Sequence, residues 1–146
     1  MFGRYQEPRR PSERQRRGSA TDPADTTRGQ AGVVNAFVKD ILGIDRRARV
    51  LVLGDLNDFD FSETVKVLET GADQRGLELV DLWHFTPQDE RYSYIFQGNG
   101  QVLDHILVSP ALLLDGRPDL DAVHINTEFT DQVSDHDPPI TRLAVP

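Results

Sequence analysis

The chain has 146 residues, of which 38% are hydrophobic and 27% charged, and these values are typical of one globular domain. It contains no cysteine, which excludes disulfides and cysteine-ligated metals, and neither a signal peptide nor an apolar run of the roughly 20 residues that a membrane-spanning helix needs is visible. The net charge of −8 divides into +3 over residues 1–28 and −11 over residues 29–146, so the acidic part is not expected to bind a polyanion by general electrostatics, and no membrane partner is predicted.

Residues 1–28 are rich in arginine, proline and small polar residues, and they show no hydrophobic periodicity. This composition predicts an irregular segment. Two interpretations stay open for it, contact with nucleic acid and a solvated arm, and the second is favoured. Residues 29–146 are predicted to form the folded domain.

The first regular element is predicted to be an amphipathic helix. Apolar residues recur from Gln30 onwards at i, i+3 and i+4 spacing, and the pattern ends near Gly43. The continuous apolar run Arg49–Leu53 then predicts a short strand that is covered on both faces. A loop over residues 54–61 follows this strand.

A second helix and a hairpin are predicted in the middle of the chain. Ser62 can cap the helix, which ends at Gly71. Arg91–Phe96 and Gln101–Val108 are rich in strand-forming residues, and the intervening sequence QGNG at 97–100 is strong turn chemistry. We therefore expect these two strands to pair with each other.

The C-terminal part is predicted to add one helical turn and two strands. The turn covers residues 111–114, and the strands cover Ala122–Ile125 and Ile140–Val145. Hairpins and strand–helix alternation occur together in this order of elements. The pattern therefore predicts an α/β or α+β fold with a mixed sheet.

Acidic residues and histidine lie beside three of the predicted strands, in GDLND (54–58), LDH (103–105) and SDHDP (134–138). Asp and Asn after a strand are common turn and capping residues, so each motif alone is a weak indication. Asp104 is different because it lies within an apolar strand, where an ionised carboxylate is costly unless it is paired. We expect a partner for it, either His136 or an arginine.

Together the three motifs supply the groups that phosphodiester hydrolysis at a metal site requires. Carboxylates bind a hard cation, most simply Mg²⁺, and an Asp–His pair orients an imidazole and raises its basicity. A neutral amide can donate to a phosphate oxygen that a carboxylate would repel. The residues of these types are Asp55, Asn57, Asp104, Asp135 and His136.

The motifs resemble those of the endonuclease/exonuclease/phosphatase superfamily, which has the deoxyribonuclease I fold. Within this superfamily, the sequence around the motifs is most similar to that of bacterial extracellular nucleases. The stretches that carry the resemblance are FGRYQEPRRPSERQR, VLVLGDLNDFDFSET, ERYSYIFQGNGQVLDHILVSPAL and SDHDPPI. The resemblance implies a four-layer α/β sandwich, of which this chain is similar to the C-terminal half only. The family's N-terminal half supplies an early Asn, the metal-binding Glu and a His or Tyr at the phosphate, and none has a counterpart here.

The resemblance also implies roles for individual residues. Asp55 would lie by the attacking water and ligate the metal, and Asn57 would hold the scissile phosphate. His136 would contact a phosphate oxygen, Asp104 would orient His136, and Asp135 would be a metal ligand. The implied metal is Mg²⁺, with Mn²⁺ or Ca²⁺ as alternatives, and the implied substrate is nucleic acid.

Other polar and aromatic residues near the motifs receive no catalytic role. By strand alternation, His105 is expected to face away from Asp104. Asp58, Asp60 and Asp137 match the functional pattern less well, and we interpret Asp58 and Asp60 as loop residues. We interpret Tyr92 and Tyr94 as packing residues and assign no role to His84, His105 and His124.

Three functions are consistent with the resemblance. The first is a divalent-metal-dependent nuclease acting on DNA or RNA, present as a partial domain that is inactive alone. The second is a catalytically silent remnant or binding module, and the third is a phosphatase or phosphodiesterase acting on another phosphate ester. Full-length relatives of this kind are secreted bacterial proteins. A half domain is expected to expose a large apolar face where its missing half would pack.

Overall fold

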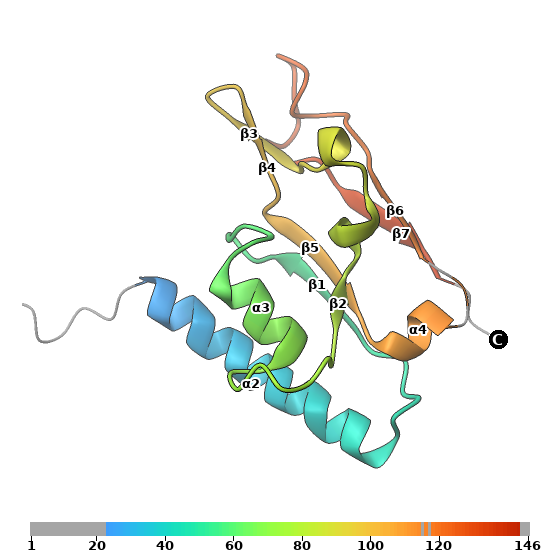
Figure 1. The fold of residues 1–146 in the computed structure, drawn as a ribbon. Helices are drawn as coiled ribbons and strands as arrows, with labels where there is room; N and C mark the ends of the chain where they lie inside the picture. The colour runs from blue at the N-terminus through green and yellow to red at the C-terminus, as the bar shows by residue number, and fades with distance from the viewer. Residues whose placement is uncertain (1–22, 115, 117, 144–146) are drawn as a thin grey trace, which may run out of the picture.

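Three α-helices, two short 3-10 helices and seven strands make up the part of the chain that the computed structural model describes, residues 23–114, 116 and 118–143 (Figure 1). The first half of this order alternates helices with strands, and the second half is mainly strands. The elements are α2 (Pro23–Ile44), β1 (Leu51–Asp55), α3 (Glu63–Thr70), β2 (Val80–Asp81), η1 (Leu82–Phe85), η2 (Gln88–Glu90), β3 (Tyr94–Phe96), β4 (Asn99–Gln101), β5 (Asp104–Val108), α4 (Pro110–Leu114), β6 (Asp119–Ala122) and β7 (Pro139–Arg142).

The first helix begins earlier than the sequence pattern predicts. α2 starts at Pro23 instead of Gln30, so the predicted irregular segment 1–28 is wrong over residues 23–28, and its remainder, residues 1–22, lies outside the described residues. Proline is favourable in the first turn of a helix because its missing N–H would have no intrahelical partner there. The first turns of α2 are polar, PADTTRGQ, and therefore show no apolar period.

α2 packs against α3 through a narrow stripe of its surface. Ala31 and Val38 are 3% and 1% exposed and join Val67 and Leu68 of α3 in one core cluster. Asn35 lies between them, and its Nδ2 donates to the carbonyl of Leu68 at 2.9 Å, which satisfies a polar group buried in this contact.

The predicted ends of α3 and the predicted helical turn are confirmed. Ser62 caps α3 by accepting a hydrogen bond from the N–H of Val65, and Gly71 ends the helix with φ 75°, a value that favours glycine. The turn expected over residues 111–114 is α4. No helix among the described residues is long and apolar enough to cross a membrane.

β5 is the central strand of a three-stranded sheet in the order β1-β5-β2. Both pairings are antiparallel, as are the pairings β3–β4 and β6–β7, so the mixed sheet that the sequence suggested is not found among the described residues. β1 and β2 run parallel to each other but lie on opposite sides of β5, which is why their helical connection through α3 creates no parallel pair.

The predicted pairing of Arg91–Phe96 with Gln101–Val108 is wrong in its second half. β3 pairs with β4 around a tight turn at Gln97 and Gly98, which have φ values of 51° and 82°. The hairpin then ends because Ser93 Oγ accepts the N–H groups of residues 103 and 104. The chain that follows is free to form β5, which pairs with β1 and β2 instead.

The prediction that Arg49–Leu53 is covered on both faces is also wrong. Val52 is partly buried against the core cluster beneath α2 and α3, whereas Leu51 and Leu53 are 39% and 62% exposed. β1 is an edge strand of the described sheet, so one of its faces and one of its edges have no covering element there. The half domain and the four-layer sandwich both stay predictions.

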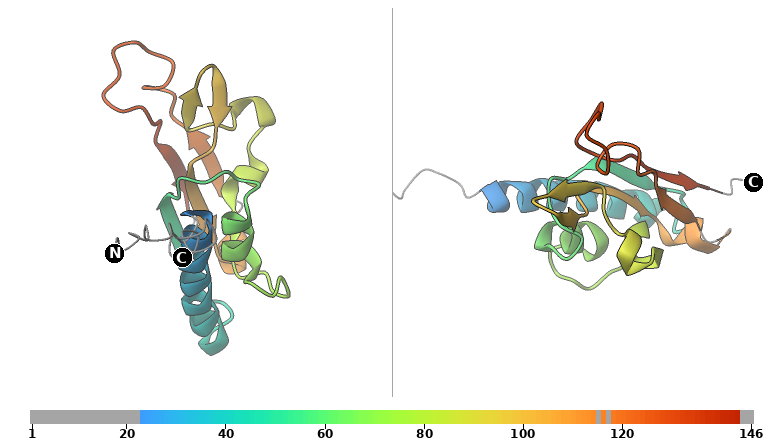
Figure 2. Two further views of the ribbon diagram at one scale, coloured as in Figure 1. Left: turned by 90° about the vertical axis from the view of Figure 1, so that its left-hand side faces the viewer. Right: turned by 90° about the horizontal axis from the view of Figure 1, so that it is seen from above.

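The two faces of β5 pack against different layers. Leu107 joins the cluster under α2 and α3, and Ile106 and Val108 join a second cluster that includes Leu120 and Ala122 of β6. Figure 2 shows the β6–β7 hairpin and α3 on opposite sides of β5. The predicted strand Ile140–Val145 is found over residues 140–142 as part of β7, and its residues 144 and 145 lie outside the described residues. The strand predicted at 122–125 is shifted towards the N-terminus as β6.

Candidate active site

The end of β1 and the start of β5 bring two carboxylates together. Asp55 and Asp104 are direct partners in the antiparallel register, so their side chains lie on the same face of the sheet. Two like charges directly opposite each other on a sheet are destabilising. This position therefore favours a positively charged group beside the two carboxylates.

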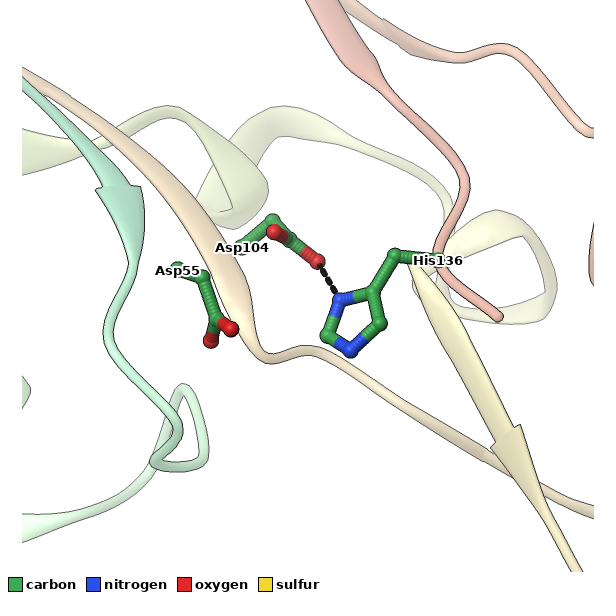
Figure 3. A group of neighbouring side chains, drawn as sticks. All are labelled: Asp55, Asp104 and His136. Carbon is green, nitrogen blue, oxygen red and sulfur yellow. Dashed lines mark hydrogen bonds and ion pairs between the residues drawn. The ribbon is translucent and has the colours of Figure 1, made fainter. Parts of the chain in front are cut away.

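His136 supplies a group that can carry such a charge. Its Nδ1 donates to Asp104 Oδ2 at 2.6 Å, and ligand atoms of His136, Asp104 and Asp55 all lie within 4.8 Å of one another (Figure 3). The chain at His136 forms an isolated antiparallel bridge with Tyr94, whose ring lies 5.0 Å from the imidazole between centroids. The structure thus unites all three polar motifs, and the partner predicted for Asp104 is confirmed as His136.

The electrostatics of the site favour the charged imidazole. Burial would lower the pKa of His136, but the hydrogen bond and negative charge of Asp104, together with the charges of Asp55 and Asp135, raise it. Because Nδ1 is held by Asp104, Nε2 is the atom that can act on a bound group. A raised pKa favours the form with a proton on Nε2, which can donate to a phosphate oxygen.

Asp137, which matched the functional pattern less well in the sequence, organises the segment behind His136. Its side chain is buried and accepts hydrogen bonds from the backbone N–H groups of residues 125–127, from the hydroxyl of Thr127 and from His124. Burial would raise the pKa of Asp137, but these donors lower it to about 2. Asn126 then donates through Nδ2 to the carbonyl of His136 at 2.6 Å. The network therefore holds the backbone of His136 in place.

Asn57 lies at the open end of the site. Its N–H donates to Asp55 Oδ1 at 2.8 Å, and its φ of 50° is in the left-handed region, which asparagine tolerates better than most residues. The preceding residue, Leu56, extends the β1–β5 pairing by donating to the carbonyl of Leu103 at 2.9 Å. Asn57 is exposed, so its amide is accessible to a bound molecule.

Asp135 is placed near the site but outside the three-residue group. It is exposed and adjoins His136, whose pKa its charge helps to raise. Ser134 accepts the N–H of His136 at 3.1 Å, which shapes this turn. The role of Asp135 as a metal ligand therefore stays a prediction.

Two residues that sequence reasoning left without a role contact the site or its loop. Tyr94, interpreted as packing, lies against the ring of His136. His105 faces away from Asp104, as strand alternation predicts, and binds Asp81 and the loop that carries Asn57. The sequence offered one indication of a role for His105. Strand alternation places it on the face opposite Asp104, and a buried histidine there needs a polar partner on that face.

The site has the donors that a divalent cation requires. Asp55 and Asp104 offer hard carboxylate oxygens from neighbouring strands, and such oxygens suit Mg²⁺, Mn²⁺ or Ca²⁺. The like charges that the sheet places opposite each other give a physical reason for a cation there. His136 could add a nitrogen ligand, although its Nδ1 is already bonded to Asp104.

An α+β fold with two carboxylates and a histidine gathered at the end of its sheet is a suitable scaffold for phosphate-ester hydrolysis. The family model described as Endonuclease/Exonuclease/phosphatase family matches residues 8–136, and the chain belongs to this family. Membership indicates a hydrolase of the nuclease or phosphatase type. Searches of curated proteins and of solved structures found no match.

Proposed function

We propose that this protein is a divalent-metal-dependent phosphodiester hydrolase that acts on nucleic acid. The observation that carries the proposal is the grouping of Asp55, Asp104 and His136 within 4.8 Å, from three segments far apart in the chain. Membership in the Endonuclease/Exonuclease/phosphatase family supports the reaction class.

Asp55, Asp104 and Asp135 are the carboxylates proposed to hold the cation, with Mg²⁺ as the first candidate and Mn²⁺ or Ca²⁺ as alternatives. When bound, the cation neutralises negative charge that develops on the phosphate. Asp55 is also exposed at the end of β1, where it can position the attacking water and accept its proton. This double role is the one that the resemblance implies for it.

Two donors are proposed to bind the phosphate. The exposed amide of Asn57 can donate to an oxygen of the scissile phosphate, and Nε2 of His136 can donate to another. Asp104 orients the imidazole through the 2.6 Å bond to Nδ1 and stabilises its charge. This bond restricts the orientation of the imidazole.

Exposed aromatic rings support nucleic acid as the substrate. Phe59 and Phe61 stack at 5.2 Å on the loop after Asp55, and Tyr94 and Phe96 lie side by side on β3 next to His136. Phe61 and Phe96 are 71% and 50% exposed. Such rings can stack on bases without selecting a sequence.

The test is metal-dependent hydrolysis of plasmid DNA, RNA, an inositol phosphate and a simple phosphodiester by the purified chain and by an Asp104→Asn variant. Asp121→Asn on β6 is a matched control, since this aspartate is exposed and is not part of the group formed by Asp55, Asp104 and His136. We expect the wild-type chain and Asp121→Asn to cleave nucleic acid when the cation is present, and Asp104→Asn to lose this activity. Equal rates in both variants would contradict the proposal, and preference for the non-nucleic-acid esters would redirect it to a phosphatase.

A second candidate is a catalytically silent binding module or one part of a larger active domain. The observation that favours it is the exposed apolar face of β1 beside Asp55, at Leu51 and Leu53, which in a complete four-layer domain would be covered. Nucleic-acid binding without turnover by this chain, and turnover after fusion to the upstream half of a secreted bacterial relative, would support this candidate. Robust turnover by the chain alone would exclude it.

A further inference from the structure

His105 lies directly behind the candidate site, on the other face of β5 from Asp104. Its side chain and that of Asp81 are both 0% exposed, and Nδ1 of His105 lies 2.6 Å from Asp81 Oδ2. Nε2 lies 3.0 Å from the backbone carbonyl of Asp58. The ring therefore connects the β2 end of the sheet to the loop after β1.

The partners of His105 determine where its protons lie. A carbonyl oxygen can only accept, so Nε2 must carry a hydrogen and donate it to Asp58. On the other side, Asp81 also accepts the N–H of Trp83 through Oδ1, and Nδ1 donates to its Oδ2. Both ring nitrogens thus act as donors.

The bond to Asp58 completes a bracket around Asn57. On one side of this residue, the N–H of Leu56 donates to the carbonyl of Leu103, which directly precedes β5. On the other side, the carbonyl of Asp58 accepts from His105 on β5. The N–H of residue 57 donates to Asp55 at the end of β1, and that of residue 59 donates to Asp58 within the loop, so neither bond ties the loop to β5.

We propose that His105, oriented by Asp81, is a positioning residue that fixes the loop carrying Asn57 over the site formed by Asp55 and Asp104. The catalytic meaning of this contact rests on the proposed function. The contact itself does not, because it is a property of the folded chain. Substrate is not expected to touch His105, since its side chain is fully buried.

Two double variants separate positioning from simple stabilisation. His105→Leu with Asp81→Asn removes the bond to Asp58 without leaving a buried unpaired charge, and Asn at 81 can still cap Trp83. His105→Gln with Asp81→Asn restores a donor that can reach the Asp58 carbonyl. His84→Gln is the control, because His84 pairs with Glu69 and is exposed.

The primary readout is amide hydrogen exchange by NMR at residues 57 and 59, compared with the β6–β7 pairing. We expect exchange in the loop to accelerate on the order of tenfold to a hundredfold in the Leu variant, to return towards the wild-type rate in the Gln variant, and to be unchanged in His84→Gln. The β6–β7 amides are expected to stay unchanged throughout. Wild-type loop rates in the Leu variant would overturn the proposal, as would equal acceleration of loop and β6–β7 amides in both double variants.

A kinetic readout links the contact to the reaction. If the wild-type chain hydrolyses a phosphodiester, the Leu variant is expected to lose kcat by on the order of tenfold or more, and the Gln variant to recover part of it, because Asn57 is held less well in the Leu variant. If the Leu variant keeps the wild-type kcat although its loop amides exchange faster, the proposal that the contact supports catalysis is overturned. If the wild-type chain shows no turnover, the proposed function is contradicted. The hydrogen-exchange experiment then still tests whether His105 holds the loop.

Discussion

Two histidine–aspartate pairs lie back to back across β5, and they differ mainly in burial. His136–Asp104 and His105–Asp81 both have an Nδ1–Oδ2 distance of 2.6 Å. The side chains of the first pair are 25% and 17% exposed, while those of the second are 0% exposed. The same chemistry therefore has two uses: an open pair keeps Nε2 available to a substrate, and a closed pair directs Nε2 to a backbone carbonyl.

The difference follows from the alternation of one strand. Asp104 and His105 are adjacent, so one points to the face that carries Asp55 and the other to the face beneath the loop. Each contributes a different member of its pair, an acid in the first and an imidazole in the second. Adjacent residues of one strand thus place a histidine–aspartate pair on each side of the sheet. The elements that pack over each side determine which pair is accessible.

The largest expected effect comes from breaking the open pair. Asp104→Asn should reduce metal-dependent phosphodiester hydrolysis by on the order of 10²–10⁴-fold, because His136 loses the carboxylate that orients it and holds its proton. Denaturant unfolding should change little, since Asn can keep a hydrogen bond at this partly exposed position. If Asp104→Asn lowered both the hydrolysis rate and the free energy of unfolding, the open pair would not differ from the closed pair in its effect on stability.

Breaking the closed pair should act on stability. Asp81→Ala should lower the free energy of unfolding by about 3–5 kcal/mol, because it leaves a buried imidazolium without its counter-charge. Urea titration followed by the fluorescence of Trp83 measures this, since Trp83 is fully buried and its indole N–H donates to the carbonyl of Asp104, the residue before His105. Asp121→Ala, exposed on β6, is the control. A change below about 1 kcal/mol would show that Asp81 and His105 are not a structural ion pair.

The hydrogen bonds of Asp137 should make the free energy of unfolding depend on pH in the acid range. The pKa of Asp137 is lowered from 3.8 to about 2, so its contribution is present above pH 3.8 and is lost as the pH falls towards 2. This shift corresponds to about 2 kcal/mol. Asp137→Asn should flatten this dependence, as measured by urea titrations between pH 2 and pH 5. An unchanged slope would contradict the lowered pKa.

The smallest expected effect concerns the exposed pair of His84 and Glu69. Burial would raise the pKa of Glu69, but the bond to His84 lowers it, and that bond raises the pKa of His84. The stabilisation from His84 is therefore complete below its ordinary value of 6.5 and is lost as the pH rises above it. His84→Gln should remove less than about 1 kcal/mol, visible as a shallower slope above pH 6.5. A larger loss would mean that exposure is a poor guide to the importance of these pairs.

The site was largely predictable from the sequence because its chemistry is local to three motifs. A carboxylate within an apolar strand needs a partner, and this requirement predicted that Asp104 pairs with either His136 or an arginine; the structure shows His136. Membership in the Endonuclease/Exonuclease/phosphatase family is consistent with the roles that the resemblance implied. Those roles, including the one for Asp135, stay predictions because no measurement of activity or metal binding addresses them.

Other features could not be predicted because they depend on contacts far apart in the chain. Nothing in the run Arg49–Leu53 shows that β1 is an edge strand, since apolar residues occur equally in covered and uncovered strands. The hairpin prediction failed because Ser93 ends the pairing through its side chain, which leaves β5 to pair with β1. The bond from His105 to the Asp58 carbonyl joins residues 47 positions apart.

The most direct test of the account is to add Mn²⁺ to ¹⁵N-labelled protein and follow paramagnetic broadening by NMR. The account predicts that low Mn²⁺ concentrations broaden the signals of Asp55, Asp104 and His136, that Asp104→Asn weakens this effect at least tenfold, and that the signals of Asp81 and β6 stay sharper. Broadening centred on the exposed acids of β6, or an unchanged response in Asp104→Asn, would contradict the claim that Asp55 and Asp104 hold the cation.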